Sequence, residues 1–100
     1  MTRVLTAAKV QVSPAAESEY IDTVQQLSWR LARRGQHVWL FRHRATPGLF
    51  LEFTEGQDQA THRSAGPVDA EERLLETRLH ALGRYEDNAP ISWDEVSFGT

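Results

Sequence analysis

A histidine and a glutamate in the middle of the chain could together transfer a proton. His43 stands near the end of the apolar segment 37–44, and Glu52 lies within the next one, 49–55. If the segments pair as a hairpin, the carboxylate could raise the pKa of the imidazole and fix its tautomer, as a general base requires. Alternatively, they form a cross-strand charge pair at a sheet end, worth about 0.2–1 kcal/mol. The sequence leaves both interpretations open.

Large aromatic residues in the same two segments could line a pocket for a flat ligand. Trp39, Phe41 and Phe50 fall on one face if the hairpin loop has an even length. Each such ring can bury about 150–250 Å². Alternatively, a second subunit covers these rings. The two interpretations are compatible if the ligand lies near the interface.

Two polar residues outside the hairpin are further candidates. Arg78 interrupts the apolar stripe of the helix expected over 69–85, where an unpaired charge is costly. It could hold an anionic group between helix and sheet, or its stem could pack on the core while the guanidinium reaches solvent and pairs with a carboxylate. His62, in the polar stretch 56–67, is a second candidate for proton transfer.

Trp29 lies opposite the apolar stripe of the first expected helix, so the core of the subunit does not need it. An exposed Trp is often an anchor in an interface. It could equally lie on Arg33 one turn later as a surface cation–π pair. Both interpretations remain open.

The histidines do not predict a metal site. Only His37 and His43 share an expected strand, and six residues of strand separate them by about 20 Å. His80 follows Glu76 by one helical turn and is expected to form a solvated pair. There is no zinc-ligand spacing, no glycine-rich phosphate loop and no cysteine. We therefore expect neither a metal nor a cofactor.

Composition places the chain among ordinary globular domains. Its 100 residues, 40% hydrophobic and 25% charged, predict a single domain over 1–100. A net charge of −3 gives no basic excess for nucleic acid. No apolar run is long enough for a membrane, and no signal peptide precedes the first strand, so a cytoplasmic protein of bacterial style is expected. A domain this small commonly gains buried area by dimerising.

The expected elements follow from periodicity and from breaker residues. Ser13 and Pro14 can cap and begin a helix that Gly35 ends, and Pro47-Gly48 marks a turn. The expected order is a strand over 3–12, a helix from 13 to 35, strands over 37–44 and 49–55, a short helical turn within 59–64, a helix over 69–85, and an edge strand over 91–98.

Both strands of the hairpin carry large apolar residues on both faces, so both faces need cover. With an even loop, one face holds Val38, Leu40, Arg42, Leu49, Leu51 and Phe53 and lies beneath the helices. The opposite face then holds Trp39, Phe41, His43, Phe50, Glu52 and Thr54. An odd loop would shift one strand by a residue and change this assignment.

The order strand, helix, strand, strand, helix, strand is the ferredoxin-like arrangement. In detail the chain resembles antibiotic-biosynthesis-monooxygenase-type domains of the dimeric α/β-barrel superfamily. The resemblance rests on Gly35 before an aromatic strand, on the segment 47–53 (Pro-Gly-Leu-Phe-Leu-Glu-Phe), and on the polar segment 58–63 with its histidine before the second long helix.

This resemblance implies an α+β fold, a four-stranded antiparallel sheet with helices on one face, and a homodimer that pairs two sheets into a barrel. Relatives of this type include cofactor-independent monooxygenases of aromatic polyketides, haem-degrading enzymes and isomerases. The haem-degrading pattern has an Asn on the first strand, which this chain lacks; its one Asn is Asn88. Fold alone does not fix the chemistry.

Two functions from different classes follow. The first is a small-molecule-binding, cofactor-independent monooxygenase-type enzyme for an aromatic or polyketide-like compound; an isomerase or decarboxylase is a weaker variant. Its ligand would contact Trp39, Phe41, Phe50, Glu52 and Arg78, with His43 or His62 transferring protons. The second is a non-catalytic homodimeric binding or assembly domain, whose aromatic sheet face is only an interface.

Overall fold

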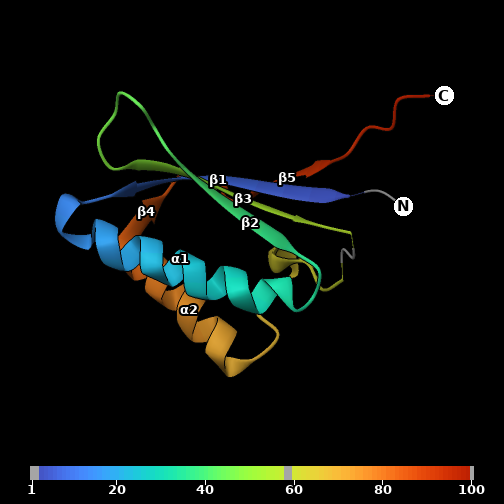
Figure 1. The fold of residues 1–100 in the computed structure, drawn as a ribbon, viewed down its shortest axis with the longest axis horizontal. Helices are drawn as coiled ribbons and strands as arrows, with labels where there is room; N and C mark the ends of the chain where they lie inside the picture. Colours follow the sequence, from blue (N-terminus) through green and yellow to red (C-terminus); the bar gives the residue numbers. More distant parts are fainter. Residues whose placement is uncertain (1–2, 58–59, 100) are drawn as a thin grey trace.

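Two helices lie against one face of an antiparallel sheet (Figure 1). The structure is a computed structural model that describes residues 3–57 and 60–99. In chain order its elements are β1 (Val4–Val12), the 3₁₀ turn η1 (Pro14–Ala16), α1 (Glu17–Ala32), β2 (His37–Arg42), β3 (Leu49–Gly56), the 3₁₀ turn η2 (Arg63–Ala65), α2 (Ala70–Leu82), β4 (Gly83–Tyr85) and β5 (Ile91–Asp94).

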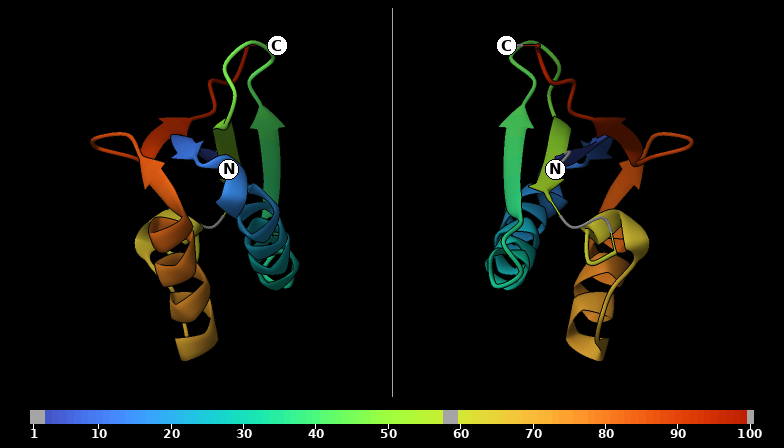
Figure 2. Two further views of the ribbon diagram at one scale, coloured as in Figure 1. Left: turned by 90° about the vertical axis from the view of Figure 1, so that its left-hand side faces the viewer. Right: turned by 90° about the vertical axis from the view of Figure 1, so that its right-hand side faces the viewer.

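The sheet has the strand order β2-β3-β1-β4, and β5 also pairs with β1. All of these pairings are antiparallel. In both side views the helices lie on the same side of the sheet (Figure 2). The predicted α+β ferredoxin-like arrangement, with helices on one face, is therefore confirmed.

The last quarter of the chain differs from the prediction. The second helix ends at Leu82 rather than at Tyr85, because the backbone of Gly83 is extended and begins β4. β4 pairs with Val10–Val12 and β5 with Val4–Ala7, so the two strands share one edge of β1. The expected strand over 91–98 ends at Asp94. The sheet thus has five strands, two of them in the position of the predicted fourth.

The start of α1 differs in detail from the expected cap. The Ser13 side chain makes no capping hydrogen bond; its carbonyl instead accepts the N–H of Ala16 at 3.0 Å, which closes the η1 turn. At the other end, Gly35 has φ +74° and the N–H of Gln36 returns to the carbonyl of Leu31 at 3.1 Å. Glycine adopts this left-handed conformation without strain, so Gly35 ends the helical segment as predicted, although the regular turns of α1 stop at Ala32.

The second helix turns a charged residue inward. Asp69 accepts the N–H of Glu72 at 2.8 Å and so caps α2. Glu72 and Leu79 are its buried residues, whereas Leu74, predicted in the apolar stripe, is 70% exposed. Glu72 can lie inside because Arg34, in the turn after α1, holds both its carboxylate oxygens, at 2.5 and 3.1 Å.

The core lies between the helices and the sheet. It consists of Val10, Val12, Tyr20, Val24, Leu27, Leu31, Phe50 and Leu79. Six of the eight are aliphatic and close-packed, and the two aromatic rings are in contact, with Tyr20 and Phe50 centroids 5.1 Å apart. Burial of this set is the main stabilisation that the chain can achieve alone.

The register of the hairpin corrects the predicted faces. Leu40 pairs with Glu52, and Arg42 pairs with Phe50, so an odd number of residues separates paired positions. Directly opposite residues share a face, and β3 is therefore displaced by one residue from the expected register. Phe50, Glu52 and Thr54 face the helices and are buried. Leu49, Leu51 and Phe53 lie on the other face.

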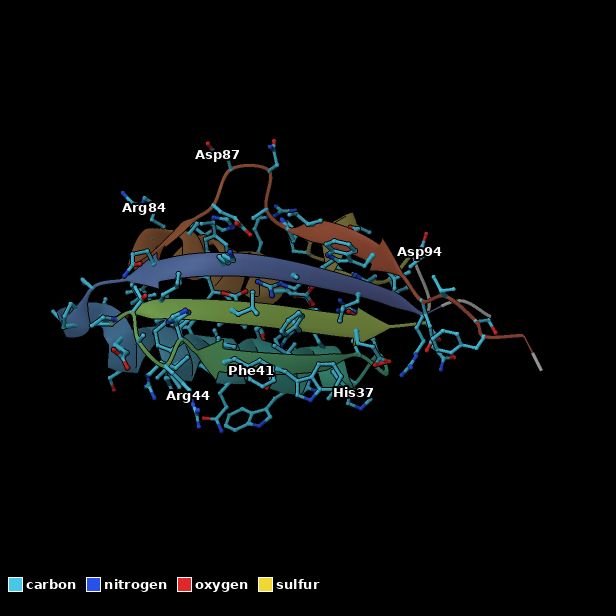
Figure 3. The ribbon with its side chains drawn as sticks, turned by 90° about the horizontal axis from the view of Figure 1, so that it is seen from above. His37, Phe41, Arg44, Arg84, Asp87 and Asp94 are labelled. Carbon is cyan, nitrogen blue, oxygen red and sulfur yellow. The ribbon has the colours of Figure 1, made fainter. Side chains whose placement is uncertain are left out.

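No helix of the described residues covers that other face (Figure 3). We call it the open face. Residues paired across neighbouring strands form rows on this face. One row is Trp39, Phe53, Ala7 and Ile91. A second row is Phe41, Leu51 and Lys9. Trp39 is 45% exposed and Phe41 54%.

Among the described helices, none is long and apolar enough to cross a bilayer.

Two glycines with nearly the same backbone angle allow a matched test of the β2–β3 loop. Gly48 has φ +76° and a Cβ there would overlap the carbonyl oxygen of Val12, whose N–H bonds to Gly48 at 2.8 Å. Gly35 has φ +74° but nothing lies within 4 Å of its Cβ position. We expect Gly35→Ala to cost about 1–2 kcal/mol from backbone strain alone. Gly48→Ala should cost more.

Urea denaturation of both variants measures the difference. Because the two substitutions share their conformational strain, the excess loss in Gly48→Ala reports the tether between the loop and β1. Equal losses of unfolding free energy would show that the tether is unimportant.

Candidate functional site

A cavity of about 210 Å³ lies on the helix side of the sheet. Side chains from β1, β3, η2, α2 and β4 converge on it. Its lining residues are Thr6, Ala8, Glu52, Arg63, Ser64, Gly66, Glu76, His80, Tyr85 and Pro90. Most of them are polar, which distinguishes this cavity from the aliphatic core beside it.

Glu52 is the most buried charged group in the cavity wall, at 3% exposure. The hydroxyls of Tyr20 and Tyr85 both donate to its Oε2 atom at 2.5 Å. Burial, and then the negative charge of Glu52, raise the pKa of Tyr20 and of Tyr85 above the ordinary value. Both phenols therefore stay protonated and act as donors at neutral pH.

Arg63 supplies the opposing charge. Its Nη1 lies 2.9 Å from Glu52 Oε1, while Nε and Nη2 donate to Glu76 Oε1 at 3.0 and 2.8 Å. Burial lowers the pKa of Arg63, but the Glu52 and Glu76 carboxylates outweigh this effect and raise it above the ordinary value. The guanidinium is thus permanently charged and is held between two carboxylates.

His62 is fully buried and uses both ring nitrogens. Nδ1 accepts the N–H of Ser64 at 3.1 Å, and Nε2 lies 3.2 Å from the carbonyl of Thr54. The neutral ring with its hydrogen on Nε2 satisfies both contacts. Burial lowers the pKa of His62. These contacts fix the start of η2 and with it the neighbouring Arg63.

His43 lies far from Glu52 in the hairpin. It follows β2, where its N–H bonds to the carbonyl of Leu49 and its Nδ1 accepts the N–H groups of Ala45 and Thr46 at 3.1 and 2.9 Å. Glu52 pairs instead with Leu40. The expected cross-strand contact between His43 and Glu52 was wrong, because the register places them three positions apart along the hairpin.

The three aromatic candidates do not share a surface. Trp39 and Phe41 lie on the open face, whereas Phe50 is in the core against Tyr20, with the guanidinium carbon of Arg42 5.4 Å from its ring centroid. Their predicted grouping was wrong for the same reason of register. Only Glu52, of the five predicted ligand-binding residues, lines the cavity.

Arg78 points away from the sheet. Its Nε lies 3.5 Å from Glu19 Oε1, and both side chains are 55% exposed. The interpretation in which the guanidinium reaches solvent and pairs with a carboxylate is therefore the one that the structure shows. Although Arg78 falls in the predicted apolar stripe of the second helix, its side chain does not lie between that helix and the sheet.

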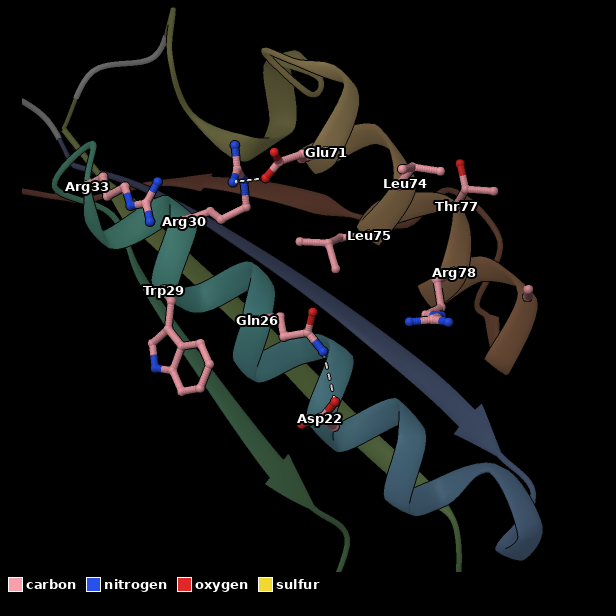
Figure 4. Close-up of a pocket in the computed structure, with 11 residues that line it drawn as sticks. Asp22, Gln26, Trp29, Arg30, Arg33, Glu71, Leu74, Leu75, Thr77 and Arg78 are labelled. Carbon is pink, nitrogen blue, oxygen red and sulfur yellow. Dashed lines mark hydrogen bonds and ion pairs between the residues drawn. The ribbon is translucent and has the colours of Figure 1, made fainter.

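A larger hollow of about 890 Å³ runs between α1 and α2 on the outer surface (Figure 4). Trp29 and Leu74 stand exposed on its walls. Much of its charge is already paired: Arg30 bonds Glu71 at 2.5 Å across the groove, and Gln26 bonds Asp22 at 2.8 Å. It is open to solvent, so buried electrostatic chemistry belongs to the smaller cavity instead.

Sequence reasoning missed several residues of the cavity. No sequence pattern indicated a functional role for Arg63 or Tyr85. Tyr85 was expected at the end of the second helix and not in a strand beside the cavity. His80 was assigned to a pair with Glu76, but Glu76 bonds Arg63, and the exposed His80 ring stacks on Tyr85 with centroids 4.2 Å apart. Within residues 3–57 and 60–99, no group of three histidine, aspartate or glutamate side chains could hold a metal ion.

Comparison with solved structures gives this fold its context. SnoaB, a cofactor-independent oxygenase from Streptomyces nogalater solved as a single-site variant, matches with a TM-score of 0.72 and 20% identity over 98% of this chain and 95% of that one. A conserved protein of unknown function from Bacteroides thetaiotaomicron matches with a TM-score of 0.78 and 12% identity, covering 94% and 98%.

An antibiotic biosynthesis monooxygenase also matches, with a TM-score of 0.66 and 16% identity over 99% of this chain and all of that one. No protein-family model matches the sequence, and no curated protein matches it. At these identities the likeness shows the fold alone. The chain therefore has the ferredoxin-like fold of antibiotic-biosynthesis-monooxygenase-type proteins, as its resemblance predicted.

The buried His62 predicts how stability depends on pH. Its folded-state pKa lies below the ordinary value of about 6.5, so the unfolded chain binds more protons once the pH falls below that value. The contribution of His62 to folding stability is therefore constant at pH values above about 6.5. It is lost as the pH falls toward the folded-state pKa of His62. We expect the melting temperature to fall between pH 7.5 and 5.5, and to fall less in His62→Gln.

His43→Gln is the control, because His43 lies in an exposed loop and not in the buried network. Thermal melts of the three proteins at both pH values measure the effect. A decrease in His62→Gln as large as in the wild type would rule out His62 as its source.

Proposed function

We propose that the chain is a homodimeric small-molecule-binding protein, and that it acts as a cofactor-independent monooxygenase-type enzyme on a small aromatic or polyketide-like compound. The observation that carries this proposal is the cavity in which Glu52, Arg63 and Tyr85 form one network, with His80 beside them. The fold shared with SnoaB supports it.

An oxygenase without a cofactor must draw its electrons from the substrate. For a CH₂ group flanked by activating rings or carbonyls, the balance is R₂CH₂ + O₂ → R₂C=O + H₂O. The protein then has to bind the substrate, remove a proton and stabilise the anion that remains. His80 is the imidazole in the cavity wall and can accept the proton.

The dimer belongs to this proposal because the open face needs cover. Trp39 and Phe41 of β2, Phe53 of β3, and Ile91 and Trp93 of β5 form an apolar surface that Ala7 of β1 joins, with exposures up to 56%. Patches of this kind on small domains mark interaction sites. A second copy of the chain, turned to place its own open face against this one, would bury them.

A specific observation favours the alternative function, a non-catalytic binding or assembly domain. The charged groups of the cavity largely satisfy one another, since Arg63 bonds or pairs with both carboxylates and two phenols hold Glu52. Such a network can serve only to fix the fold. In that case the aromatic open face would be the functional surface.

Disruption of the open face tests the dimer. We expect a wild-type dimer at micromolar concentration and a monomer for Phe41→Asp, since a carboxylate would be buried in the interface. Leu74→Asp is the matched control, because Leu74 is also an exposed apolar residue but lies on α2 away from the open face. Sedimentation velocity measures all three. A wild-type monomer at every concentration would contradict the proposal.

Oxygen consumption tests the enzyme. With hydroxylated aromatic compounds that carry an acidic CH₂ group, we expect stoichiometric uptake of O₂ and a kcat about 10²-fold or more lower in His80→Gln, the usual effect of losing a general base. His37→Gln, an exposed histidine on the opposite face, should retain activity. A dimer that consumes no oxygen with any compound would favour the assembly function.

A further inference from the structure

One oxygen of the buried Glu52 carboxylate has no hydrogen-bond donor among the described residues. The side chain is 2% exposed, and its Oε1 atom is the one without a donor. The oxygen belongs to a residue that lines the 210 Å³ cavity. A buried carboxylate oxygen without a donor is costly, so its position beside a cavity indicates a missing donor.

The hydrogen bonds of the surrounding groups go to atoms other than Oε1. Both phenols donate to the other oxygen, Oε2. Arg63 Nη1 lies 2.9 Å from Oε1 as an ion pair without hydrogen-bond geometry, while three of the five N–H groups of Arg63 bond Glu76 and the Thr54 hydroxyl. Oε1 therefore keeps acceptor capacity that a molecule in the cavity could use.

Charge decides which kind of donor fits. Two carboxylates, Glu52 and Glu76, and a single guanidinium, Arg63, line the cavity, so an anionic ligand is disfavoured. An ammonium group is disfavoured at Oε1 itself, because it would lie beside the Arg63 guanidinium. A neutral hydroxyl meets both conditions and satisfies the acceptor.

Size narrows the choice further. Ligand pockets commonly hold about 300–1,000 Å³, and this cavity is smaller. We propose that the cavity binds a neutral, single-ring hydroxyl compound of the size of phenol, whose O–H donates to Glu52 Oε1, and that it rejects carboxylates of similar size. The inference rests on the proposed small-molecule function and names its ligand class.

The experiment is an NMR titration of the ¹⁵N-labelled protein with phenol, benzyl alcohol, benzylammonium and benzoate. We expect the two alcohols to shift the amides of Thr6, Ala8 and the η2 turn, and to bind at least tenfold more tightly than benzoate or benzylammonium. Equal binding of the four compounds, shifts confined to other surfaces, or no binding by the alcohols would overturn the proposal.

Two variants tie the binding to the cavity. In Glu52→Gln the phenols hold the amide oxygen at the Oε2 position, so an NH₂ group replaces the acceptor and alcohol binding should fall at least tenfold. Ala8→Leu fills the cavity without changing Glu52 and should abolish alcohol binding. If Glu52→Gln fails to fold, this variant still tests whether the alcohols bind in the cavity. Leu74→Asp, on the exposed side of α2 and outside the cavity lining, should still bind the alcohols.

The readouts separate this inference from the proposed enzyme. Alcohol binding without oxygen consumption would support the proposed ligand class and contradict the proposed monooxygenase activity. Oxygen consumption with other aromatic compounds, without alcohol binding, would contradict only the proposed ligand class. Alcohol binding that survives Ala8→Leu would place the ligand elsewhere and overturn the inference.

Discussion

The ion pair between Glu52 and Arg63 connects more of the molecule than any other polar contact described above. Glu52 belongs to the middle of β3 and Arg63 to η2, and the pair extends to α1 through Tyr20, to β4 through Tyr85 and to α2 through Glu76. A buried charge is tolerated only when it is neutralised locally. Each of these elements must therefore hold its position for the others to be stable, and the cavity is what remains between them.

The two faces of the sheet separate two tasks. The helix face carries the aliphatic core and the polar network, and the helices of the same chain cover both. The open face carries Trp39, Phe41 and Trp93, for which the described chain offers no cover. Alternation along β1, buried at every second residue, is what allows one strand to serve both surfaces.

The fold could be predicted from the sequence, while most of the site could not. Breakers such as Gly35 and Pro47-Gly48 and the apolar periodicity located the main elements. The faces of β3 depended on one residue of register, which the loop sequence does not specify, and that residue moved Phe50 and Glu52 across the sheet. Arg63 and Tyr85 meet Glu52 through tertiary contacts between distant segments, for which one sequence has no local signal.

The passage from α2 to β4 has a mechanical consequence. Leu82 ends the helix and Gly83 begins the strand, with no loop between them, and the glycine lies so close to Val10 that a side chain there would overlap it. His80 of α2 and Tyr85 of β4, whose rings stack on each other, therefore belong to one continuous segment that pairs with β1. A tilt of α2 would therefore displace the cavity wall and the side of the outer groove together, because α2 contributes residues to both.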